Sequence, residues 1–177
     1  RYARLLVEYG YLVDCSVTPR VNWKTAKGAP QGDGGTDYRH FPQHAYFLDE
    51  NDIRREGQSS LLEVPMSIQY KHPAWMNSLK QGYDRLRGKV RSPSVHWLRP
   101  MGGNVETMKK VVEQTLTQGN DYVEYMLHSS EYMPGGSPTF KNEQDIERLY
   151  AELDAFFSWL APQVKGICLL YTSDAAD

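Results

Sequence analysis

The sequence has little cysteine, little excess of either charge and no long apolar run. Two cysteines among 177 residues exclude the disulfide-dense class of small secreted domains. The 20 basic and 22 acidic residues leave a formal net charge of -2, which predicts no attraction to nucleic acid or to an anionic membrane surface. No apolar stretch approaches the roughly 20 residues of a membrane-spanning helix. What is present is a 40% apolar content, enough to bury one core.

Both ends of the chain are unusual. It begins at Arg1 without a methionine and enters a helical pattern at once, so we expect that a preceding part is missing. The last ten residues, CLLYTSDAAD, resemble a translated sequencing adapter, although a genuine strand with a polar tail is the alternative. We therefore expect one domain over residues 1–167 and a non-native tail over residues 168–177. Without the tail, Cys15 is the single cysteine and the net charge is about zero, because 20 acidic residues then face 20 basic ones.

Helical and strand patterns alternate along the chain. Gly10 is expected to end a first helix, Asn104 and Asn142 are expected to cap two later ones, and Pro162 to end the last. The remaining pattern predicts a helix over 74–87, strands over 11–14, 61–69, 94–99 and 121–130, and a long aromatic-rich loop over 15–60. Pro65 is expected to mark a bulge or the end of regular pairing in the second strand, and Tyr150 is expected on the buried stripe of the last helix.

This alternation predicts the α/β class, with βα units around a mainly parallel sheet that is either open or closed as a barrel. Functional groups of such folds gather at the C-terminal ends of the strands. Asp14, Ser67, Arg99 and His128 stand at these positions in the predicted strands.

Four segments carry a resemblance to a known family: GYLVDCSVTP, SLLEVPMSI, HWLRPMGGN and above all EYMLHSSEYMPGGSPTF. They resemble the C-terminal part of the polysaccharide deacetylase family, carbohydrate esterase family four. The resemblance implies a partial irregular (β/α) barrel that lacks its N-terminal strands. It also implies a metal-dependent hydrolase that acts on carbon–nitrogen bonds other than peptide bonds and removes acetyl groups from the amino sugars of a glycan.

The resemblance also assigns roles to residues. In the motif Met126-Leu127-His128, it makes His128 the general acid and Leu127 part of an apolar pocket for the acetyl methyl group. The family's aspartate pair and metal ligands would precede Arg1, so the resemblance implies a divalent metal such as zinc in the full-length protein only. We expect no tight metal binding and no activity from the chain as given. Imidazole suits the assigned role because the leaving amine must be protonated near neutral pH.

Three further residues are candidates for substrate binding. Arg99 can bind a carboxylate or sugar hydroxyls, or can instead form a salt bridge to Glu63 or Glu131. Asp14 can bind substrate or receive loop amides. Trp23 can stack on a sugar ring or be buried under the long loop.

His40 and His44 have the i, i+4 spacing of metal ligands, but Pro42 between them prevents a regular helix, and we interpret them as loop histidines. Two other functions stay open. A carbohydrate-binding descendant of the fold would need no metal site. A glycoside hydrolase on a related barrel would need two carboxylates across a cleft, for which Glu63 and Glu131 are the candidates.

Overall fold

The computed structural model describes residues 2–24, 26, 31–88 and 93–165, so the predicted tail over 168–177 lies outside the described residues. Contacts divide the chain into two compact units. The first unit comprises residues 1–98 and 110–126, and the second comprises residues 99–109 and those from 127 onward.

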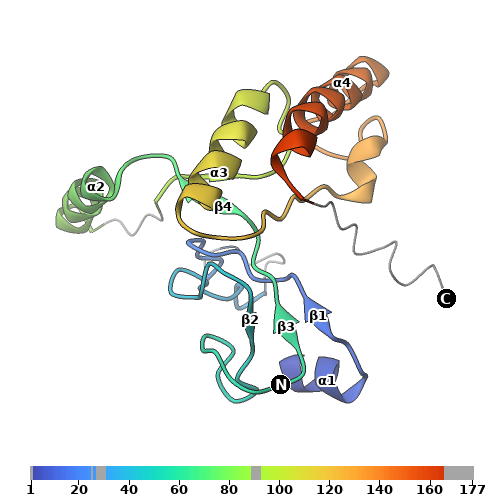
Figure 1. Cartoon of the computed structure of the whole chain (residues 1–177). Helices are drawn as coiled ribbons and strands as arrows, with labels where there is room; N and C mark the ends of the chain where they lie inside the picture. Colours follow the sequence, from blue (N-terminus) through green and yellow to red (C-terminus); the bar gives the residue numbers. More distant parts are fainter. Residues whose placement is uncertain (1, 25, 27–30, 89–92, 166–177) are drawn as a thin grey trace. The chain divides into compact units, whose positions relative to one another are not determined.

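All four predicted helices are present (Figure 1). None of the helices in the described ranges is long and apolar enough to cross a membrane. The helices are α1 (Tyr2–Glu8), α2 (Ala74–Leu86), α3 (Val105–Thr117) and α4 (Glu143–Leu160), with short 3-10 helices at Ser129–Tyr132 and Ala161–Gln163. The strands are β1 (Val13–Asp14), β2 (Tyr46–Phe47), β3 (Leu62–Glu63), β4 (Ile68–Tyr70) and β5 (Val95–Trp97).

Local signals decide where several of these elements begin and end. Gly10 follows α1 with a φ of +78°, a backbone conformation that glycine adopts without a steric penalty. The Asn142 side chain accepts a hydrogen bond of 3.0 Å from the backbone N–H of Asp145, as a helix N-cap does. Pro162 lies in the 3-10 turn that follows α4. These three predictions are confirmed.

The described strands form two small sheets in the first unit. In the sheet ordered β1-β3-β2, β1 and β3 are parallel while β2 and β3 are antiparallel, and Figure 1 shows α1 beside these strands. The second sheet is the antiparallel pair of β4 and β5. Pro65 separates β3 from β4, as the sequence predicts. A mainly parallel sheet is thus absent from the described strands, which do not close into a barrel, and the partial barrel stays a prediction.

Each unit has its own apolar cluster. In the first, Ala3 of α1 packs with Tyr46, Leu48 and Leu61 around β2 and β3. In the second, three buried residues belong to α4 and to the chain just before it: Phe140, Ile146 and Leu149. Burial of Phe140 ties the segment that follows His128 to the apolar face of α4.

The predicted strand over residues 121–130 is wrong. Residues 122–128 belong to no strand, and Ser129–Tyr132 form a 3-10 helix. The segment is held by scattered bonds in place of a ladder: the N–H of Glu124 donates to Ser67 Oγ at 2.9 Å, and that of Met126 donates to the carbonyl of Leu98 at 3.1 Å. Alternating apolar residues therefore mark a half-buried extended segment here, which periodicity alone does not distinguish from a strand.

Two predictions for the helices also need correction. Asn104 precedes α3, but its side chain turns back to the loop, accepting from the Met101 N–H at 2.7 Å and donating to the Arg99 carbonyl at 2.9 Å. It stabilises the preceding turn and does not cap the helix. Tyr150, expected on the buried stripe of α4, is 50% exposed, and Glu152 is buried instead.

Candidate functional site

Parallel strands β1 and β3 end side by side, each with a carboxyl group. Asp14 and Glu63 are partners in the strand register, which brings the two carboxyl groups side by side. Glu63 is only 1% exposed, and its Oε1 accepts the backbone N–H of Val17 at 3.0 Å. Ser16 Oγ donates to Asp14 Oδ2 at 2.9 Å. This arrangement agrees with the expectation that polar groups gather at the C-terminal ends of parallel strands.

A third carboxyl group, Glu124 of the extended segment, completes what we call the carboxyl cluster: Asp14, Glu63 and Glu124. Burial, then the charges of Asp14 and Glu124, raises the pKa of Glu63 to about 8. Burial and the charge of Asp14 raise the pKa of Glu124 to about 8 as well. Burial therefore favours the protonated form of both glutamates, a property that suits an acid catalyst and is uncommon for carboxyls in water.

Cys15 lies beside Glu124 of the carboxyl cluster, and its thiol is kept in the protonated form mainly by burial. Burial, followed by the charge and hydrogen bond of Glu124, raises the pKa of the Cys15 thiol to about 12. The thiolate is the nucleophilic form of cysteine, so this side chain has little reactivity at neutral pH. Oε2 of Glu124 is buried and has no hydrogen-bond partner within the described ranges.

In the second unit, Glu131 binds both Arg99 and the backbone of His128. Glu131 is 2% exposed, and its two oxygens accept from Arg99 Nη2 at 2.7 and 2.8 Å. Oε2 also accepts the backbone N–H of His128 at 3.1 Å. The ion pair between Arg99 and Glu131 was one of the two alternatives for Arg99. Nε of Arg99 is buried without an acceptor among the residues that the structure describes.

His128 precedes the 3-10 helix with an extended backbone, and its side chain is exposed. The Glu131 N–H donates to the His128 carbonyl at 2.9 Å, so the two residues are linked through both backbone groups of His128. Gly136 packs so closely on the carbonyl of Ser130 that a Cβ there would clash. The turn around His128 is therefore ordered while its imidazole ring meets solvent.

The structure assigns the candidate residues to different units. Arg99, Leu127 and His128 belong to the second unit, where Leu127 is half-buried. Asp14 and Trp23 belong to the first. Trp23 is 36% exposed, and the rest of its surface is covered: its Nε1 donates to Thr18 Oγ1 at 2.7 Å, and its ring lies 6.0 Å from that of Trp97.

The structure also describes the histidines considered as metal ligands and the two glutamates considered for a glycoside hydrolase. His44 Nε2 lies 2.8 Å from Glu56 Oε1 on the surface, and no group of three or more His, Cys, Asp or Glu side chains within the described ranges is arranged to hold a metal. Of the two glutamates considered for a glycoside hydrolase, Glu63 belongs to the carboxyl cluster of the first unit. Glu131 belongs to the second unit and is bound to Arg99.

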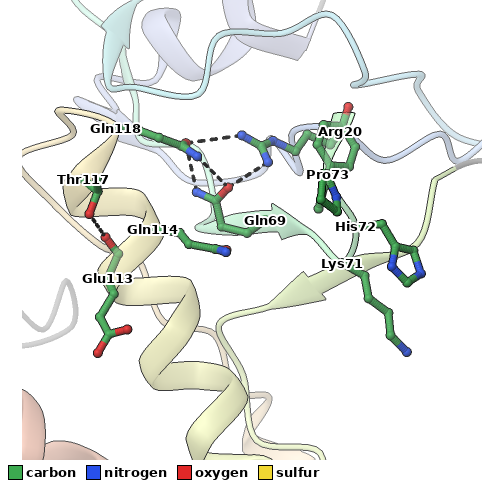
Figure 2. A pocket seen from close by; sticks show the side chains of 10 residues that line it. Arg20, Gln69, Lys71, His72, Pro73, Glu113, Gln114, Thr117 and Gln118 are labelled. Atoms are coloured by element: carbon green, nitrogen blue, oxygen red, sulfur yellow. Dashed lines mark hydrogen bonds between the residues drawn. The ribbon is translucent and has the colours of Figure 1, made fainter. Parts of the chain in front are cut away.

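A pocket of about 630 Å³ in the first unit was not predicted from the sequence (Figure 2). This volume lies within the roughly 300–1,000 Å³ of small-molecule sites. A buried arginine, Arg20, lies in its wall together with residues of β4 and α3. The Thr-Pro-Arg-Val stretch predicts a turn at most, so no local signal connects Arg20 to partners 49 and 98 residues away in the chain.

Comparison of the chain with family models, with curated proteins and with solved structures gives no match.

Proposed function

We propose that this chain is the C-terminal part of a hydrolase of the polysaccharide deacetylase type, which removes acetyl groups from the amino sugars of a glycan. The observation that carries the proposal is the turn at His128. Within the residues that resemble the family's last motif, Ser129–Tyr132 form a 3-10 turn, the exposed His128 directly precedes it, and Glu131 of this turn accepts the His128 backbone N–H.

In the proposed reaction His128 acts as the general acid. Amide hydrolysis passes through a tetrahedral intermediate, and its amine leaves only after it gains a proton, which imidazole donates near neutral pH. Glu131 is a positioning residue because it holds the backbone of His128 and not the ring. The Arg99 side chain keeps 23% of its surface exposed beside its pair with Glu131, and in the proposal this exposed part binds an oxygen of the substrate while Leu127 contacts the acetyl methyl group.

The metal that the resemblance implies has no ligand set among the described residues, and the resemblance itself assigns its ligands to positions before Arg1.

The test uses the chain extended by its upstream sequence, with His128→Ala and His128→Gln. On an N-acetylated oligosaccharide we expect the rate to fall by roughly 10²–10⁴-fold, and on an aryl acetate, whose leaving group needs no proton, to fall much less. His44→Ala is the matched control, because His44 is also exposed and close to a glutamate. Equal losses on both substrates, or no loss on either, would show that His128 is not a proton donor.

A carbohydrate-binding role without catalysis is the second candidate, and the polar pocket in the first unit favours it. Glycan binding that persists in an extended chain without any acetate release would support this candidate over the hydrolase.

A further inference from the structure

Arg20 is a buried cation without a buried anion. It is 6% exposed, and its guanidinium donates to amide oxygens only: to Gln43 from Nε at 3.1 Å and also from Nη2, to Gln69 from Nη1 at 2.8 Å, and to Gln118 from Nη2 at 3.4 Å. The face of the guanidinium lies 4.5 Å from the centre of the Tyr70 ring. Arg20 has no ion pair with any residue in the described ranges. Buried charges are ordinarily paired, so this one lacks a full negative charge that a ligand can supply.

The backbone at Arg20 is also unusual. The Val21 N–H bonds to the Thr18 carbonyl at 3.3 Å, which closes a turn with Pro19 and Arg20 at its centre. Arg20 has a φ of +69°, and it is the one residue other than glycine with a positive φ in the described part of the chain. Glycine or asparagine usually occupies this position of a type II turn. Backbone strain of this kind is typical of functional sites, and here it brings a guanidinium into the pocket wall.

The other residues of the pocket favour an acidic and hydroxylated ligand. Lys71 and Glu113 contribute one charge of each sign to the lining, and Figure 2 draws the charged ends of both turned away from the guanidinium of Arg20, so neither balances its charge. The amides of Gln69, Gln114 and Gln118 provide both donors and acceptors at the pocket wall. The C-terminal end of α3 offers the guanidinium only a partial negative charge.

We propose that this pocket binds an acidic saccharide, whose carboxylate lies on the guanidinium of Arg20 in place of the Gln118 amide. The contact between Arg20 Nη2 and Gln118 is the longest of the present bonds of the guanidinium, and a carboxylate oxygen that replaced the Gln118 oxygen there would make a shorter, charge-assisted hydrogen bond. Amide side chains then bind the sugar hydroxyls. The choice of a saccharide rests on the proposed function, whereas the choice of an anion rests on the geometry of Arg20.

The test is a titration of the chain with methyl β-D-glucuronoside and with methyl β-D-glucoside, which differ in the carboxylate. Side-chain amide signals of Gln69 and Gln118 in ¹⁵N NMR spectra report binding at the site. We expect saturable shifts with the glucuronoside and at least about ten-fold weaker binding of the glucoside, the loss for one charge-assisted hydrogen-bonded pair. Equal affinities for the two glycosides, no saturable shift with either, or sulfate binding as tight as the glucuronoside would overturn the proposal.

Two variants locate the carboxylate. Arg20→Gln should abolish the preference for the glucuronoside, but it changes a buried residue and can impair folding. Gln118→Glu changes an exposed residue and provides an internal carboxylate for Arg20, so it should raise the thermal midpoint and weaken glucuronoside binding at least about ten-fold. Unchanged binding by Gln118→Glu would overturn the proposal.

Arg39→Gln is the control, because Arg39 is in the same loop and already pairs with Asp37 at 2.6 Å, and it should bind the glucuronoside like the parent chain. These experiments measure binding and not catalysis. The binding result therefore stands even if the hydrolase proposal fails, and the assay of the His128 variants can be interpreted even if the pocket binds no saccharide.

Discussion

Replacing Glu63 by glutamine tests whether the carboxyl cluster holds protons at neutral pH. Glutamine has nearly the same shape, and its amide oxygen can still accept the N–H of Val17, which donates to Glu63 Oε1. The replacement removes the ionisable group from a position that is 1% exposed. Its effect on stability should therefore depend on pH.

The sign and the size of this dependence follow from the pKa of Glu63, which is raised from 4.5 to about 8 by burial and by the nearby carboxyls. Between these values the folded protein keeps a proton that the unfolded chain releases, so the free energy of unfolding falls as the pH rises. At about 1.4 kcal/mol for each pH unit, the whole window corresponds to about 5 kcal/mol. From pH 5.5 to 8, the parent chain should lose about 3 kcal/mol relative to Glu63→Gln.

Urea denaturation at pH 5.5, 7 and 8, followed by tryptophan fluorescence, measures the difference. Glu8→Gln is the control: Glu8 is exposed on α1, and its replacement should change the free energy of unfolding by less than about 0.5 kcal/mol at each pH. A difference between the parent and Glu63→Gln that stays constant from pH 5.5 to 8 would refute the reasoning, because Glu63 would then ionise alike in the folded and unfolded chains.

Three further predictions concern the buried polar groups and the turn at His128. Glu131→Gln should lower the free energy of unfolding by about 2–4 kcal/mol in urea denaturation, because Arg99 loses its carboxylate in a largely buried pair. Cys15, with its pKa raised to about 12, should react slowly with iodoacetamide at pH 8, and Glu124→Gln should accelerate its labelling in peptide mapping by mass spectrometry, because a neighbouring charge is removed. Gly136→Ala should lower the thermal midpoint, with a cost of about 1–3 kcal/mol, because its Cβ would clash with a backbone carbonyl.

Each of these predictions has its own contrary outcome. Glu106→Gln is the control for Glu131, since Glu106 forms an exposed pair with Lys109, and equal effects of the two changes would argue against a buried pair of any importance. Labelling of Cys15 as fast in the folded chain as in urea would contradict the raised pKa. For the turn, Gly136 has no positive φ, so the clash alone should destabilise Gly136→Ala, and an unchanged thermal midpoint would contradict the close packing on the Ser130 carbonyl.

Features that depend on neighbours in the chain could be predicted from the sequence. The N-cap at Asn142, the end of α4 before Pro162 and the break at Pro65 each follow from the hydrogen bonds that one side chain or one proline ring permits within a few residues. The positions of all four helices followed in the same way from apolar periodicity. Alternation predicted a strand after Asp121 but could not show whether a neighbouring strand was present to pair with it.

The sites were decided by tertiary structure. Val17 and Glu63 are 46 residues apart, Arg20 and Gln118 are 98 residues apart, and their environments arise only when β1, β3, β4 and α3 are folded. Before folding, Glu63 and Arg20 are ordinary solvated charges. Folding removes the water around Glu63 and Arg20 and replaces it with a few protein atoms. The chemistry of those atoms determines whether the carboxyl keeps its proton and whether the guanidinium has an anionic partner.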